Sequence, residues 1–218
     1  MTQNSTIKKV RRVAYDDLHE ACILKAMAII ETDGVEKLSL REVARLLGVS
    51  HQAPYKHFPS RDHILAEIVK RTFDDFGHFL DARASNAEGQ LDLHGMGMAY
   101  LNYAASNPLQ YRLMFGTPLP DASQHPEMMR SAQHTFALLR DCIARMALPS
   151  SVELDALYVW STMHGLASIL QTSALSSLAL SDTIMSSAVQ HIMARMDLGL
   201  KTTLTPKMSA GRPAAHGV

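Results

Sequence analysis

The chain contains 218 residues, of which 47% are hydrophobic and 19% charged, and its 21 lysines and arginines balance its 21 aspartates and glutamates. This composition excludes a largely disordered chain, and no apolar run reaches the ~18 to 20 residues of a membrane span. The two cysteines, Cys22 and Cys142, lie far apart on apolar patterns. We therefore expect a globular protein of one or two domains without a structural disulfide, located in a reducing cytoplasm.

The first twelve residues form a basic arm without acidic residues, containing Lys8, Lys9, Arg11 and Arg12. Such an arm suits contact with nucleic acid or another anionic surface. A solvated terminus that only improves solubility is an equally good interpretation, so the arm by itself does not identify a function.

Apolar residues then recur at spacings of three and four, and sustained alternation is absent, which predicts an all-α fold. The first helix is expected from Tyr15 to Thr32, with Gly34 as its stop. Ser39 to Glu42 read as a capping box that opens a second helix, which ends at Leu47 because Gly48 can adopt the left-handed conformation.

Ser50 is expected to cap a third short helix that continues to about Phe58, and Ser60 a long fourth helix. Two short helices joined by Gly48, Val49 and Ser50 have the spacing of a helix-turn-helix, whose second helix can enter the major groove of DNA. An ordinary pair of antiparallel helices is the competing interpretation. Basic and hydrogen-bonding residues between His51 and Arg61 favour DNA binding.

The chain turns small and polar between Asp81 and Gln90, where we place a domain junction. Five further helices are expected at Leu91 to Ser106, Pro108 to Phe115, Pro126 to Ala147, Ser151 to Ser173 and Ser181 to Leu198. The predicted organisation is a basic flexible arm (1–12), a helix-turn-helix DNA-binding domain (13–80), a helical effector-binding and dimerisation domain (81–200) and a disordered tail (201–218).

The segment from about Leu18 to Val69 resembles the tetracycline-repressor-like (TetR) transcriptional regulators. The resemblance rests on four short motifs, Ser39 to Ala44, Gly48 to Ser50, Tyr55 to Phe58 and Pro59 to Arg61. Pro54 departs from the usual pattern of that family and indicates a locally altered helix start. A weaker resemblance, through Trp160 to Gly165, points to the subset with a Trp-x-x-x-His-Gly signature.

This resemblance implies a homodimeric, ligand-released repressor that binds a palindromic double-stranded DNA operator. Base edges would meet His51, Gln52 and Ala53. Phosphates would meet Ser39, Tyr55, Lys56, His57 and Arg61. Ser50 is also expected to contact DNA, and the four basic residues of the arm would follow phosphates or enter the minor groove. Packing is an alternative role for Tyr55 and His57. The last two helices would form the dimer interface, with Leu166, Ile169, Leu170, Ile192 and Met196 as candidate contacts.

Methionines and aromatic residues accumulate in the second half, where an adaptable apolar pocket could hold an apolar or amphipathic small molecule. The candidate ligand-binding residues are Tyr103, Met114, Phe115, Phe136, Trp160, Met163 and His164. Plain core packing is the commoner role of any one of them.

No motif indicates a cofactor, a metal site or a catalytic centre, so an enzyme is the least favoured class. An architectural DNA-binding protein without an effector remains the main alternative to a ligand-responsive regulator.

Overall fold

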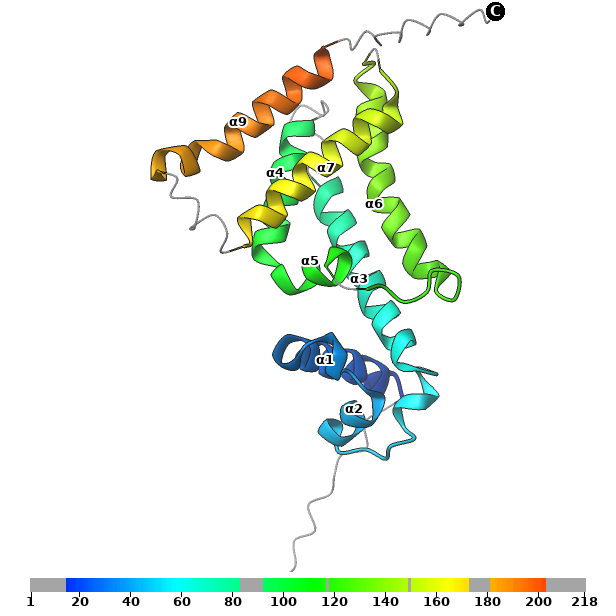
Figure 1. The fold of residues 1–218 in the computed structure, drawn as a ribbon. Helices are drawn as coiled ribbons and strands as arrows, with labels where there is room; N and C mark the ends of the chain where they lie inside the picture. The colour runs from blue at the N-terminus through cyan, green and yellow to red at the C-terminus, as the bar shows by residue number, and fades with distance from the viewer. Residues whose placement is uncertain (1–14, 83–91, 117, 149, 173–180, 203–218) are drawn as a thin grey trace, which may run out of the picture. The chain divides into compact units, whose positions relative to one another are not determined.

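The computed structural model describes residues 15–82, 92–116, 118–148, 150–172 and 181–202, and all regular elements within them are helical (Figure 1). In chain order these are α1 (Tyr15–Asp33), the 3-10 helix η1 (Val35–Lys37), α2 (Leu40–Leu47), the 3-10 helix η2 (Pro54–Lys56), α3 (Arg61–Asp81), α4 (Leu93–Ser106), α5 (Pro108–Phe115), α6 (Pro126–Arg145), α7 (Val152–Leu170) and α9 (Asp182–Lys201). The all-α prediction is confirmed. None of the described helices is long and apolar enough to cross a membrane.

The chain divides into two compact units. Unit 1 combines residues 1–78 with 106–135, and unit 2 combines residues 79–105 with 136–218. The predicted junction falls largely on residues 83–91, and the arm and the tail beyond Thr202 also lie outside the described residues. The functional boundaries expected at residues 80 and 200 stay predictions.

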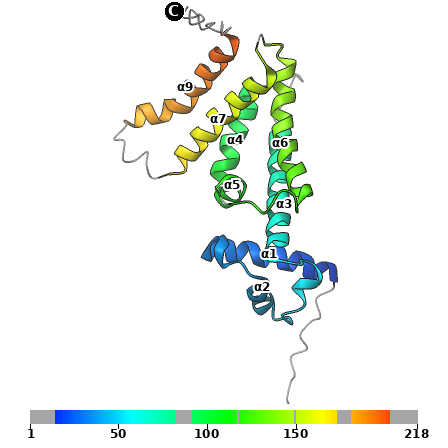
Figure 2. The ribbon, with the colours of Figure 1, turned by 45° about the vertical axis from the view of Figure 1, so that its right-hand side comes forward.

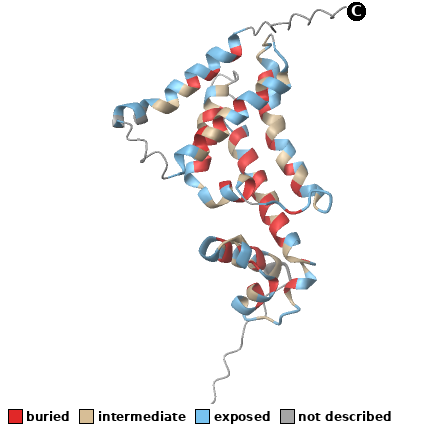
Figure 3. Ribbon diagram, viewed as in Figure 1, coloured by how far each residue is buried: buried red, intermediate tan, exposed pale blue. Residues whose placement is uncertain are grey.

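In unit 1, α1 packs against α2 and the two 3-10 helices (Figures 1 and 2). Cys22, Ala26, Ile29 and Ile30 recur at helical spacing and are all buried, as their pattern predicts. Figure 3 shows buried and exposed residues alternating along the helices, as expected where one side of a helix packs against the core. Burial of this apolar stripe stabilises the packing of α1 within the unit.

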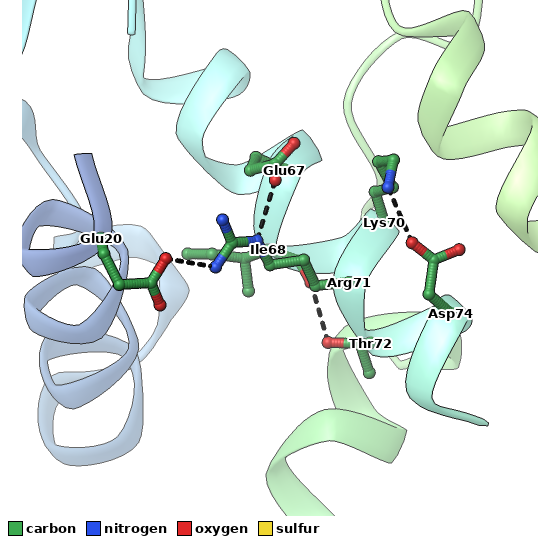
Figure 4. A network of polar contacts seen from close by, with 7 residues as sticks. All are labelled: Glu20, Glu67, Ile68, Lys70, Arg71, Thr72 and Asp74. Carbon is green, nitrogen blue, oxygen red and sulfur yellow. Dashed lines mark hydrogen bonds and ion pairs between the residues drawn. The ribbon is translucent and has the colours of Figure 1, made fainter. Parts of the chain in front are cut away.

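A polar network joins α1 to α3 within unit 1 (Figure 4). The guanidinium of Arg71 donates to Glu67 one turn earlier, at 2.8 Å, and to Glu20 of α1, at 2.6 Å. Lys70 donates to Asp74 at 2.7 Å, and the Thr72 hydroxyl donates to the carbonyl of Ile68. Of these ion pairs, only Arg71–Glu20 links the two helices, and because it is partly exposed it contributes more to the orientation of α1 on α3 than to stability.

In unit 2, α7 lies beside α9 (Figures 1 and 2). Gly97 of α4 leaves room for Met193 of α9, because a Cβ at Gly97 would stand 2.7 Å from the Met193 methyl group. Met163 of α7 is also buried close to this point, with its methyl group 3.6 Å from where that Cβ would stand. Small and flexible residues therefore shape this contact.

Helix ends differ from the expected ends by one to three residues in most places. The helix Pro108–Phe115 has the predicted bounds. Helix α6 ends at Arg145 and α7 at Leu170, earlier than expected, and Ala147 adopts a left-handed φ of 50° just after α6. Helix α9 continues to Lys201, where an ion pair of 2.6 Å with Asp197 spans its last turn.

Candidate nucleic-acid interface

Helix α2 begins and ends as its sequence predicts. The Ser39 hydroxyl accepts the backbone N–H of Glu42 at 3.2 Å, and Gly48 closes the helix with a φ of 67°. The reciprocal bond expected from Glu42 to the cap is replaced, since its carboxylate accepts two bonds from Arg45 at 2.8 and 2.6 Å. The hydrogen bond from Arg45 lowers the pKa of Glu42.

The prediction of an α-helix from Ser50 to Phe58 is wrong. Residues 51–53 are turns, and η2 follows with Ala53 at its N-terminus and no side-chain cap. Pro54 explains the difference, because a proline has no N–H with which to continue a helical ladder from Ser50. The Phe58 N–H does bond the Pro54 carbonyl at 2.9 Å, so the segment still makes a compact turn-helix unit.

Four side chains around this segment surround a hollow of about 580 Å³. They are Arg41, His51, Gln52 and Tyr55. Tyr55 is 42% exposed, and the other three also face solvent. The hollow therefore brings a cation, an imidazole, an amide and a phenol to one surface, a combination suited to phosphates and base edges.

Arg41 is the member of this group that the sequence prediction missed. It belongs to the basic excess of the segment, but nothing local shows that the second residue of α2 lies across from Gln52. Ser39, Ser50 and Lys56 are exposed on the same segment, whereas Ala53 and His57 are half-buried.

Arg61 has structural partners inside unit 1. Its guanidinium donates to the carbonyl of Val35 at 2.7 Å and to that of Leu38 at 3.2 Å, and it also bonds Asp62. These contacts tie the start of α3 to η1. A phosphate contact by Arg61 stays a prediction, and the four basic residues of the arm lie outside the described residues.

His57 also lies among neighbours within unit 1. Its ring centroid is 5.7 Å from that of His19 and 6.4 Å from that of Phe58. This geometry supports the packing role considered for His57, and a phosphate contact by His57 stays a prediction.

The candidate effector residues fall into two groups. In unit 1, Met114 is buried, and the ring of Phe115 lies 5.9 Å from that of Phe73 and 5.0 Å from that of Tyr111. In unit 2, Tyr103 and Met163 are buried, while the Trp160 ring lies 5.9 Å from that of Phe136. A cavity shared by these residues stays a prediction.

A polar pair accompanies the unit 2 group. The Tyr100 hydroxyl lies 3.2 Å from Nδ1 of His164, and the His164 ring is 6.2 Å from Trp160. Burial lowers the pKa of His164, which favours a neutral imidazole at pH 7. Tyr100 is absent from the predicted ligand residues, since only folding brings it to His164.

The candidate dimer residues are divided by burial. Leu166 and Met196 are buried inside unit 2, so they are unsuited to contact a second chain. Ile169 and Leu170 are exposed, and Ile192 is half-buried. Four further large apolar side chains of α7 and α9 are at least half exposed: Leu154, Leu157, Ile184 and Leu198.

Both cysteines are buried and reduced, and burial raises the pKa of each thiol. Within the described ranges, no three histidine, cysteine, aspartate or glutamate side chains are grouped so as to hold a metal ion.

Two family models match the chain. The model of bacterial regulatory proteins of the tetR family matches residues 23–68, and that of the tetracyclin repressor-like C-terminal domain matches residues 93–196. The first match contains α2 and η2, and the second contains Trp160 to Gly165. Membership of the Trp-x-x-x-His-Gly subset stays a prediction.

Similar sequences of individual proteins point to the same family. The HTH-type transcriptional regulator Mb1846 of Mycobacterium bovis is 25% identical over 130 residues, which are 58% of this chain and 55% of that regulator. The chain therefore spans about half the length of this relative.

Solved structures share the fold. The crystal structure of the regulatory protein SCO4313 is similar to this chain, with a TM-score of 0.70 and 24% sequence identity. The similarity covers 84% of this chain and 96% of SCO4313. A bacterial regulatory protein in the tetR family from Rhodococcus RHA1 is similar with a TM-score of 0.58 and 18% identity, over 82% and 96% of the two chains.

Proposed function

The chain belongs to the TetR family of transcriptional regulators, and we propose that it binds DNA as a homodimeric repressor that a small molecule releases from its operator. The observation that carries the proposal is the exposed group of Arg41, His51, Gln52 and Tyr55 around one hollow. We place this group in the major groove. As a regulator of transcription, the protein would act in the cytoplasm.

We assign the contacts by chemistry. The amide of Gln52 can pair bidentately with adenine, the His51 ring can bond a base edge, and the Ala53 methyl can touch thymine. The cations of Arg41 and Lys56 and the hydroxyls of Ser39, Ser50 and Tyr55 suit phosphate oxygens, which set register. The basic arm would add phosphate contacts and increase the salt dependence of binding.

Dimerisation is proposed through the exposed faces of α7 and α9. Leu157 is 50% exposed and Leu198 55%, so in a single chain these apolar side chains are in contact with water. A Cβ at Gly165 of α7 would meet nothing within 4 Å, so a second helix has room to approach there. Two-fold symmetry would place two recognition segments about 34 to 36 Å apart and make the operator palindromic.

Effector binding is proposed at the aromatic and methionine residues of the second half. An apolar or amphipathic molecule would use Met163, Phe136 and Trp160 as walls and the Tyr100 and His164 pair as a polar contact. Release from DNA requires that the effector prefer the conformation that fits the operator less well. A ~100-fold preference corresponds to about 2.7 kcal/mol of coupling.

The test begins with selection of bound duplexes from a random pool by the full-length chain. We expect an enriched palindrome of two half-sites. A thermal-shift screen of small apolar and amphipathic molecules should then yield ligands that raise Tm and weaken operator binding. Enrichment of a single non-repeated half-site would contradict the dimer, and ligands that raise Tm without changing operator affinity would contradict release.

A further inference from the structure

A groove of about 280 Å³ in unit 1 is lined by four histidines. They come from four different places in the chain: His19 from α1, His57 from the end of η2, His63 from α3 and His125 from the residue before α6. This volume lies just below the ~300 to 1,000 Å³ range of ligand pockets, which points to a small ligand. Apart from His57, which was considered above as a phosphate contact, no residue of this groove has a role in the proposed DNA binding.

The histidines form two pairs. The ring centroids of His63 and His125 are 4.9 Å apart in an edge-to-face arrangement, and those of His19 and His57 are 5.7 Å apart. The Ser60 hydroxyl lies 2.9 Å from Nδ1 of His63, a contact that holds this ring in place. His63 is exposed and His125 half-buried, so both can be reached from solvent.

The acidic groups around the groove already have partners. On α3, Glu67 is bonded to Arg71, which also bonds Glu20 of α1, and Lys70 is bonded to Asp74 (Figure 4). Glu127 of α6 pairs with Arg130. In the preceding loop, Asp121 accepts two bonds from Ser123, each 2.9 Å long, and Asp62 pairs with Arg61.

The charges around the groove therefore determine which kind of ligand it can bind. The edge-to-face rings of His63 and His125 place two potential N–H donors on one side of the groove. An anion that contacts both rings can accept a charge-assisted hydrogen bond from each when they are protonated. Arginine, lysine or hydroxyl donors engage the acidic side chains named above. Asp121 also interacts electrostatically with His125, so an anion competes with this one carboxylate.

We propose that this groove binds a small anion whose carboxylate or phosphate oxygens accept hydrogen bonds from both His63 and His125, at the open side of this pair of rings. The Gln124 amide, the His19 and His57 pair and the Lys70 ammonium group also line the groove, together with the ion-paired carboxylates of Glu67 and Glu127. Binding takes up protons, so it strengthens as the pH falls. Because the groove joins the end of η2 to the start of α6, a bound anion holds these two segments of unit 1 together. The proposal does not depend on the assignment of the operator contacts or of the effector.

The test is calorimetric titration of the full-length chain with inorganic phosphate and, separately, with succinate. We expect saturable binding of at least one anion at pH 6.0 with a Kd of about 1 mM or below, weakened about fivefold or more at pH 7.5. Titration in two buffers of different ionisation enthalpy should show proton uptake. Binding of phosphate alone or of succinate alone identifies which oxygen chemistry the groove prefers.

The decisive variant is H63Q combined with H125Q, which keeps hydrogen-bonding side chains but cannot become charged. It should lose at least tenfold in affinity and all proton uptake, while H134Q, an exposed histidine of α6 outside the groove, should bind as the unmodified chain does. If the double variant unfolds, the pH-dependent ring signals of His63 and His125 in the unmodified chain, followed by NMR during titration, provide the same test. Absence of saturable binding of both anions at pH 6.0, or full binding by the double variant, would overturn the proposal.

Discussion

At the scale of single residues, neighbouring exposed side chains of one segment are suited to different tasks. Gln52 and Lys56 both face solvent on the segment between α2 and α3. An amide can recognise a base edge, whereas an ammonium group recognises any phosphate. The two residues therefore distinguish sequence recognition from general attraction.

Gln52→Ala should weaken binding to the selected operator by about 1 to 3 kcal/mol and relax the preference at one base position. Lys56→Ala should weaken binding to all duplexes alike and make the salt slope shallower by about 0.9 per phosphate contact. Fluorescence anisotropy over a salt series measures both, with Gln133→Ala, an exposed glutamine of α6, as the control. Wild-type affinity and slope in both variants would show that this segment is not the recognition element.

Arg61 is expected to act mainly on stability. Arg61→Ala removes two bonds to the carbonyls of Val35 and Leu38, and since the side chain is 39% exposed we expect a loss of about 1 to 2 kcal/mol in the free energy of unfolding. Arg41→Ala removes the same charge from an exposed site and should leave stability unchanged. Urea denaturation provides the measurement, and equal stability of the two variants would refute the anchoring role.

His164 should make stability depend on pH. Its pKa is lowered in the folded chain by burial, so the unfolded chain binds the proton more readily. The stability associated with the neutral imidazole is present above pH ~6.5 and is lost as the pH falls through the folded pKa. Replacing His164 with Gln should flatten the pH dependence of the unfolding free energy between about pH 7 and pH 5, relative to the exposed-site control His94→Gln. An unchanged profile would mean that the pKa of His164 does not differ between the folded and the unfolded chain.

At the scale of elements, backbone chemistry at the ends of α2 determines how the helix-turn-helix is built. Ser39 caps its start and Gly48 closes its end, and Pro54 then converts the next helix into a turn followed by η2. Each of these three residues acts through its own local preference and not through packing. The shape of the recognition segment therefore depends on short local rules.

Gly48→Ala tests one of these rules. The left-handed φ of 67° is strained for a residue with a Cβ, and nothing lies within 4 Å of the added methyl group. We expect a loss of about 1 kcal/mol in unfolding free energy, with a smaller loss for Gly48→Asn, because asparagine tolerates this conformation. Chemical denaturation compares the two, and equal losses would indicate that a steric contact, and not backbone strain, governs this site.

At the scale of the whole molecule, the surface left apolar on α7 and α9 predicts the assembly. Leu157→Glu places a charge in the proposed interface and should convert the dimer to a monomer at micromolar concentration, with operator affinity reduced at least tenfold. Leu24→Glu alters a leucine of α1 that is 64% exposed and should leave the dimer intact. Sedimentation velocity distinguishes these outcomes. A dimeric Leu157→Glu variant would move the interface away from this face of α7.

The all-α class, the order of the helices, the Ser39 cap and the Gly48 stop could all be predicted from the sequence. They depend on spacing and on conformational preference within a few residues, so local chemistry is enough to determine them. The family resemblance was likewise carried by short motifs at fixed offsets, and the matches over residues 23–68 and 93–196 agree with it.

Tertiary structure alone determined which distant side chains meet. It brought Arg41 to Gln52, Tyr100 to His164 and His63 to His125, and it turned the guanidinium of Arg61 toward the carbonyls of Val35 and Leu38. It also separated Leu166 and Met196, which are buried, from Leu157 and Leu198, which are exposed. Helical spacing shows only that residues share a face. The partner that covers this face, and the residues brought to it from elsewhere in the chain, are determined by long-range packing.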